Sequence, residues 1–196
     1  MSSMAVYGLE GEIDVDVTIN ENTPCTPNSY YGKSKLAAEN EINKLTDNNF
    51  SIAIVRSPMV YGPNCPGNYR LLRKFARMIR IFPDIKNQRS MIFINNLTEF
   101  LRLLIDHQDK GLFFPQNKEY VETITMAKLI AFFYGKKIIL SKILGWLMKA
   151  GKNKLEIANK IFGNLSYNQK LSKHYDWSYC KVGFEESIEL TEKNTV

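Results

Sequence analysis

Residues 29–40, SYYGKSKLAAEN, constrain this chain most, because they set a tyrosine and a lysine four residues apart in a segment that favours a helix. In a helix this spacing puts Tyr31 and Lys35 on one face, one turn apart. A free tyrosine is a poor base at neutral pH, but a fixed ammonium nearby favours its phenolate. The pair therefore predicts a proton-transfer site. A surface tyrosine beside a solvated lysine is the alternative, since this spacing often arises by chance.

Three further blocks accompany this segment in a fixed order. They are SSMAVYG at residues 2–8, IAIVRSPMVYGP at 52–63 and QRSMIFINNL at 88–97. Together with the tyrosine segment they resemble the extended short-chain dehydrogenase/reductase family, specifically its NAD-dependent nucleotide-sugar epimerases and dehydratases, such as the UDP-glucose 4-epimerases. The resemblance runs from Ser2 to about residue 135, and more faintly to the C-terminal EESIEL.

The resemblance implies an α/β fold: the C-terminal portion of a Rossmann-like doubly wound parallel sheet plus a small, mostly helical substrate-binding subdomain. Residues 1–64 would be the remnant of the NAD-binding domain, and residues 65–196 would mainly bind the nucleotide sugar, with some segments returning to the Rossmann domain. Relatives begin with a glycine-rich G-x-x-G-x-x-G turn that holds NAD, and this sequence contains none. We therefore expect an N-terminally truncated chain, incomplete as an enzyme by itself.

The same resemblance assigns catalytic and cofactor residues. Ser3 would bond to the reacting sugar hydroxyl or carbonyl, Tyr31 would take the proton, and Lys35 would also hold ribose hydroxyls of NAD. The segment SPMVYGP, predicted as a loop, would lie beside the nicotinamide, where Pro58 and Val60 would contact NAD together with Tyr31 and Lys35.

Substrate contacts are expected from Ser3, Met59, Asn68 and Arg89. Met59 stands where many relatives carry asparagine and begins the sugar pocket, and Arg89 would reach the diphosphate or ribose of the nucleotide. Asn68 is also predicted to cap the helix that follows it. Asn95 replaces the family's usual aspartate and is expected to cap the next helix, which gives it a structural role.

The implied function is an NAD-dependent nucleotide-sugar epimerase, acting on a UDP-sugar for surface-polysaccharide synthesis. Met4 and Ala5 replace the Asp-Glu pair of the dehydratases, which favours an epimerase or a simple 4-oxidoreductase. Two alternatives stay open: a non-catalytic remnant that binds a nucleotide sugar or a protein, and an NAD(P)-dependent 4-keto-sugar reductase.

Composition limits the class of protein and the compartment in which we expect it. With 44% hydrophobic and 23% charged residues the chain is typical of a globular protein, and no apolar run reaches the roughly 18 residues needed to cross a bilayer. We expect a cytoplasmic protein with no stable membrane insertion, no nucleic-acid partner and no metal site. The resemblance leaves a homodimer open, since relatives often pair through the helix that carries the tyrosine and its neighbour. Its three distant cysteines suit a reducing compartment.

The net charge of +6 is unevenly distributed. Residues 136–173 hold nine lysines and the single acid Glu156, interleaved with apolar residues. This pattern is typical of a small helical subdomain with a solvated lysine face, the interpretation we favour. A basic amphipathic segment on an anionic membrane or on nucleic acid is the alternative, and a positive field that attracts a diphosphate substrate is compatible with the first.

Overall fold

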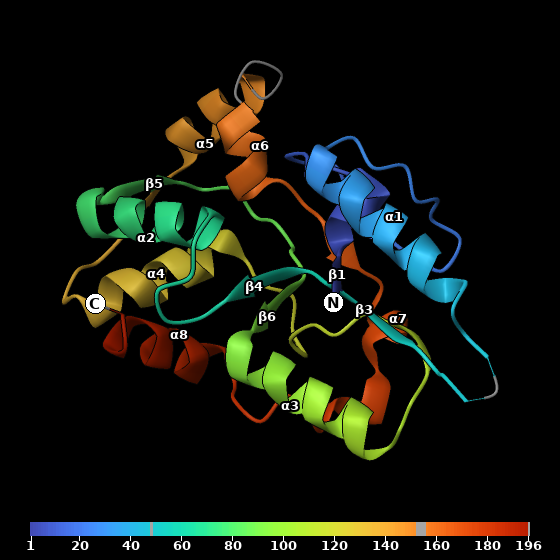
Figure 1. The fold of residues 1–196 in the computed structure, drawn as a ribbon. Helices are drawn as coiled ribbons and strands as arrows, with labels where there is room; N and C mark the ends of the chain where they lie inside the picture. Colours follow the sequence, from blue (N-terminus) through green and yellow to red (C-terminus); the bar gives the residue numbers. More distant parts are fainter. Residues whose placement is uncertain (48, 152–155, 196) are drawn as a thin grey trace.

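The computed structural model describes residues 1–47, 49–151 and 156–195. Its central element is a parallel three-stranded sheet in the order β1-β3-β7, formed by Ser2–Ser3, Ala53–Ser57 and Gly111–Phe113. Ser3 pairs with Ser57 and Val55 with Phe113. The β-branched run at residues 51–56 thus forms the predicted buried parallel strand, flanked on both sides, as in a Rossmann-like sheet (Figure 1).

Three strand pairs extend this framework, and all are parallel. Strand β4 (Met59–Tyr61) pairs with β6 (Met91–Phe93), β2 (Thr18–Ile19) with β9 (Ser166–Tyr167), and β5 (Ile81–Pro83) with β8 (Ile139–Ser141). The prediction of a continuous loop over SPMVYGP was wrong. Its β-branched and aromatic residues pair with the similar MIF segment of β6, which gives their backbone groups ladder partners.

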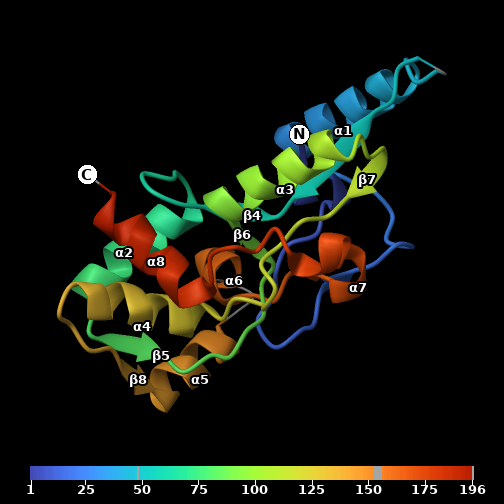
Figure 2. The same ribbon diagram turned by 90° about the horizontal axis from the view of Figure 1, so that it is seen from below.

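The helices pack around this framework in two groups (Figures 1 and 2). Helix α1 (Tyr30–Asn43) lies against β1 and the 3₁₀ turn η1 (Met4–Tyr7), and α3 (Ile94–Asp106) packs on the sheet through Phe100. Helices α2 (Asn68–Met78), α4 (Thr123–Phe133) and α8 (Phe184–Lys193) enclose a second core, which α6 (Glu156–Phe162) joins.

The remaining helical elements are short. Helix α5 (Lys142–Ala150) packs on β5, and α7 (Gln169–Ser172) and η3 (His174–Trp177) lie in the C-terminal segment. No helix among the described residues is long and apolar enough to cross a membrane.

Several predicted helix boundaries are confirmed and others are wrong. A helix near residues 141–150 and a terminal helix after Gly183 are predicted by the sequence, and both are present as α5 and α8. Ser141 is the cap of α5, accepting a hydrogen bond from the N–H of Leu144. Asn68 and Asn95 are not caps, because α2 begins after Gly67 and α3 begins at Ile94, so both asparagines lie inside their helices. The expected substrate-domain helix over 152–162 is present from Glu156, and its residues 152–155 lie outside the described part.

Helical spacing over residues 29–46 predicts Leu36, Ala37, Ile42 and Leu45 on the buried side of α1, and this prediction is mostly wrong. Leu36 packs against a small core, but Ala37, Ile42 and Leu45 are exposed. The helix is held instead by polar and backbone contacts nearer its N-terminus, which belong to the site described next.

Candidate active site

Tyr31 and Lys35 lie on the same face of α1, as predicted. The Lys35 Nζ atom stands 5.7 Å from the centre of the Tyr31 ring, within the range of a cation–π contact. Lys35 also donates a long hydrogen bond of 3.4 Å to the carbonyl of Met1, at the start of β1. The tyrosine is 55% exposed, and its hydroxyl makes no hydrogen bond to any residue in the described part of the chain, so an external ligand can reach it.

The N-terminal turn of α1 is pressed against the turn that follows Ser3. A Cβ added to Gly32 would stand 2.4 Å from the carbonyl oxygen of Ala5, so only glycine permits this approach. Ser29 caps the helix by accepting a 3.1 Å hydrogen bond from the Gly32 N–H. Ser3 lies on the sheet side of this contact, at the end of β1. Its side chain caps η1 by accepting a hydrogen bond of 3.2 Å from the N–H of Ala5.

These contacts bring Ser3, Tyr31 and Lys35 to one edge of the sheet. Ser3 lies at the carboxyl end of a parallel strand, where open α/β sheets bind ligands. The serine hydroxyl at this end, the phenol and the ammonium are the groups that a hydroxyl-bearing sugar and a ribose can use as hydrogen-bond partners.

A buried ion pair fixes α1 to the sheet. Arg56 in β3 makes a bidentate contact with Glu39 of α1, with Nε–Oε1 and Nη2–Oε2 distances of 3.0 and 2.7 Å. Its Nη1 donates to the Tyr7 hydroxyl at 2.8 Å. Burial alone would lower the pKa of Arg56, but the hydrogen bonds and charges of Glu39 and Tyr7 outweigh it and raise that pKa. Glu39 is one turn beyond Lys35, so this ion pair helps to set the position of the helix face that carries Tyr31 and Lys35.

Sequence reasoning missed this cluster. The sequence pattern places Arg56 in a family-like segment and Glu39 in a run that favours a helix, and it predicts no contact between them. An arginine within a β-branched run is the signal that was available, because a buried guanidinium needs a carboxylate or several hydrogen-bond acceptors.

The residues expected at the nicotinamide follow β3 directly. Pro58 is buried between β3 and β4, and Val60 is partly buried within β4. Both therefore lie beyond the carboxyl end of β3, the neighbour of the strand that carries Ser3.

The other predicted substrate residues come together elsewhere. Met59, Asn68 and Arg89 all line one small pocket, whose volume is about 20 Å³. That volume holds about one water molecule, so a nucleotide sugar needs this pocket to open. Ser3 and Tyr31 do not line it.

Arg89 contacts the backbone at the end of α6. Its Nη1 donates to the carbonyl of Lys160 at 2.7 Å and makes longer contacts to those of Ile161 and Gly163, at 3.5 and 3.3 Å. These are carbonyls that a helix end leaves without intrahelical partners. Burial lowers the pKa of the guanidinium, so its charge is incompletely solvated.

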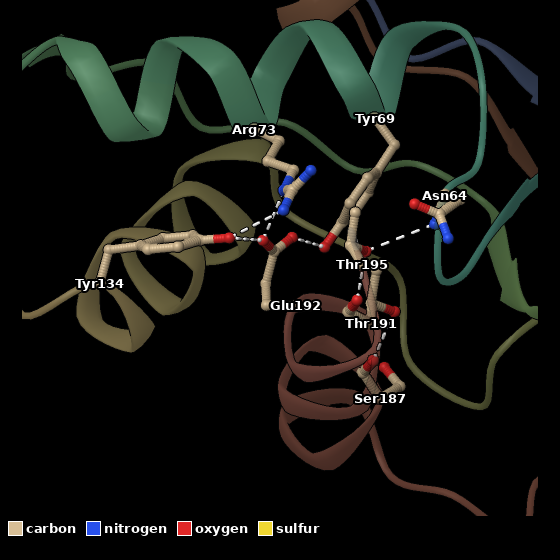
Figure 3. A network of polar contacts seen from close by, with 8 residues as sticks. All are labelled: Asn64, Tyr69, Arg73, Tyr134, Ser187, Thr191, Glu192 and Thr195. Atoms are coloured by element: carbon tan, nitrogen blue, oxygen red, sulfur yellow. Dashed lines mark hydrogen bonds and ion pairs between the residues drawn. The ribbon is translucent and has the colours of Figure 1, made fainter.

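A second buried network joins α2, α4 and α8 (Figure 3). The carboxylate of Glu192 accepts from the hydroxyls of Tyr69 and Tyr134, at 2.7 and 2.9 Å, and pairs with Arg73 at 2.7 Å. It borders a pocket of about 280 Å³ that is lined by none of the predicted site residues. The polar groups of this network are hydrogen-bonded to one another, so we assign it a structural role, which is to hold the helices together.

Together, the parallel sheet and the Tyr–Lys pair on the helix packed beside it fit an extended short-chain dehydrogenase/reductase. Residues 1–114 match the NAD dependent epimerase/dehydratase family. The match covers more than half of the chain, and the protein belongs to this family.

Curated relatives share parts of the sequence. The chain is 30% identical over 148 residues to a UDP-glucose 4-epimerase of Vibrio cholerae, a match that covers 71% of this chain and 45% of the relative. It is 34% identical over 116 residues to the N-acetyl-alpha-D-glucosaminyl-diphospho-ditrans,octacis-undecaprenol 4-epimerase of Escherichia coli O157:H7, covering 56% and 33%. The chain therefore spans less than half the length of these relatives.

The fold is also found in solved structures. The UDP-glucuronic acid 4-epimerase of Bacillus cereus in complex with NAD aligns with a TM-score of 0.69 and 17% identity, over 98% of this chain and 57% of that one. The alignment confirms the predicted Rossmann-like architecture.

Proposed function

We propose that this chain carries the proton-transfer pair and the substrate side of an NAD-dependent nucleotide-sugar 4-epimerase. The observation that supports it best is the arrangement of Tyr31 and Lys35 on one face of α1, held against the turn after Ser3. Met4 and Ala5, in place of an acid pair, favour epimerisation over dehydration.

NAD, when bound, would supply the hydride acceptor and donor. Tyr31 removes the proton of the sugar hydroxyl and later returns it, and the nearby ammonium of Lys35 stabilises the negative charge on the phenolate oxygen during that transfer. Ser3 holds the same sugar oxygen by a hydrogen bond. The donor set fits the cofactor: Lys35 has one long hydrogen bond, so its ammonium retains protons for ribose hydroxyls.

We propose a UDP-sugar of surface-polysaccharide synthesis as the substrate, since UDP-glucose and a diphospho-polyprenol sugar appear in the names of the two relatives. Arg89 would pair with the diphosphate, and its incomplete solvation favours an anionic partner. Met59 and Asn68 lie beside it. In this assignment residues 1–64 serve the cofactor and residues 65–196 serve mainly the substrate, and the reaction takes place in the cytoplasm.

Titration with NAD tests the proposal when the chain is joined to the part of the Vibrio cholerae relative outside the match. Lys35→Met should weaken NAD binding at least about tenfold, because a charge-assisted hydrogen bond is worth about 1.5–3 kcal/mol. Lys33→Met is the matched control: the residue lies on the same helix, is exposed, and should leave the affinity unchanged. Failure of this joined protein to bind NAD, or equal effects of both substitutions, would contradict the proposal.

A further inference from the structure

Helix α5 presents an apolar face to solvent. Ile143, Trp146 and Leu147 are 75, 67 and 53% exposed. The opposite face is packed, and a Cβ added to Gly145 would stand only 2.7 Å from the carbonyl oxygen of Asp84. A helix that is apolar on both faces is normally buried on both, so the outer face of α5 is suited to a second apolar environment.

The exposed apolar surface continues beyond α5. Ile81 of β5 and Ile139 of β8 are cross-strand partners, and both are exposed. Met78 at the end of α2 and Phe132 near the end of α4 are also exposed. Figure 2 shows β5, β8 and α5 together at one end of the molecule, next to α4. Exposed apolar residues gathered on neighbouring elements form an apolar patch, which is typical of an interaction surface.

Basic residues outnumber acidic ones beside this patch, although Asp84 lies against α5. Residues 123–151 contain five lysines and no aspartate or glutamate, and residues 51–83, which include α2, contain no acid either. Lys149 is paired with Asp14 at 2.7 Å, and Lys136 donates to the backbone carbonyl of Arg77. Lys137 and Lys142 are exposed at the two ends of β8, so their ammonium groups face solvent.

We propose that this end of the molecule docks on the surface of an anionic phospholipid bilayer. Apolar and tryptophan side chains enter the interfacial layer, and lysines around them contact lipid phosphates. The nine-residue α5 is about 14 Å long, far short of the roughly 30 Å of a bilayer core. It therefore lies in the interface and does not span it.

Charge argues against the other occupants. A second copy docked through the same face would bring two lysine clusters together, which costs free energy. Nucleic acid would engage the lysines but leave the aliphatic side chains of Ile143 and Leu147 in water, since its affinity comes mainly from phosphate contacts. A bilayer interface satisfies both parts of the surface.

Vesicle co-sedimentation of the 196-residue chain tests the proposal. Binding is expected to vesicles of phosphatidylglycerol and phosphatidylcholine but not to phosphatidylcholine alone, and added salt should weaken it. Ile143→Ser should reduce the partition constant about tenfold. Ile105→Ser on α3 is the matched control, since Ile105 is 74% exposed, and it should have no effect.

A charge-reversal pair provides a second arm. Lys142→Glu should weaken binding several-fold, whereas Lys33→Glu on α1 should not. Thermal unfolding of each variant verifies that it is folded. Three results would overturn the proposal: no binding to anionic vesicles, equal effects of Ile143→Ser and Ile105→Ser, or a self-association that Ile143→Ser abolishes.

Discussion

Replacing Glu39 by glutamine should destabilise the protein by about 3 kcal/mol, although glutamine has nearly the same shape. Both side chains of the Glu39–Arg56 pair are buried, and Arg56 makes contacts of 3.0, 3.3 and 2.7 Å with the carboxylate. Removing one partner leaves the other charge uncompensated in the interior, which typically costs about 3–5 kcal/mol. The amide oxygen of glutamine can still accept from the guanidinium, so we expect the lower end of that range.

Urea unfolding followed by circular dichroism measures the effect. With a slope of about 2–3 kcal/mol per molar, the midpoint should fall by about 1–1.5 M. Glu41→Gln is the control on the same helix, because Glu41 pairs with Lys44 at the exposed surface and should leave the midpoint unchanged. The double variant Glu39→Gln with Arg56→Gln should lose less free energy of unfolding than the sum of the two single variants, because no unpaired charge is then left in the interior.

A loss below about 1 kcal/mol for Glu39→Gln would refute this reasoning. It would mean that Arg56 finds other acceptors, and that α1 is positioned by its contact at Gly32 alone.

Two other predictions concern stability and assembly. Burial raises the pKa of Tyr61 to about 12, so its protonated form is favoured in the folded state and its contribution to stability should disappear as the pH rises from about 10 to 12. The free energy of unfolding of Tyr61→Phe should therefore decrease less over that interval than the free energy of unfolding of the parent. Parallel pH profiles of the two proteins would contradict the assignment. We propose that a homodimer forms through α1 and the turn after it, where Ile42 and Leu45 are exposed. Leu45→Glu should then give a monomer in sedimentation equilibrium, and a parent that is already monomeric would contradict this proposal.

Local sequence chemistry predicted much of the fold. The β-branched run before Arg56 predicted the central strand β3. Gly135 was predicted to end the helix before it, and it follows α4 with a left-handed φ of 65°, a conformation that glycine adopts without strain. The spacing of Tyr31 and Lys35 predicted their common face, because i and i+4 neighbours depend only on helix geometry.

Features that depend on tertiary partners could not be predicted. Met59 to Tyr61 became a strand only because β6 lies next to it. Ile42 and Leu45 follow an amphipathic pattern, but helical periodicity cannot say whether a surface is present to cover them. Arg89 contacts carbonyls of a helix about 70 residues further along the chain, a pairing that no local pattern encodes.

The central claim is that Tyr31 transfers the proton of the substrate hydroxyl, and a turnover measurement tests it most directly. Because the chain spans less than half of its curated relatives, the assay joins it to the part of the Vibrio cholerae enzyme outside the match and follows conversion of a UDP-hexose to its 4-epimer. Tyr31→Phe should lower kcat about 10²–10⁴-fold with little change in nucleotide affinity, while Tyr30→Phe, the exposed neighbour on α1, should not. An active parent whose kcat is unchanged by Tyr31→Phe would contradict the account.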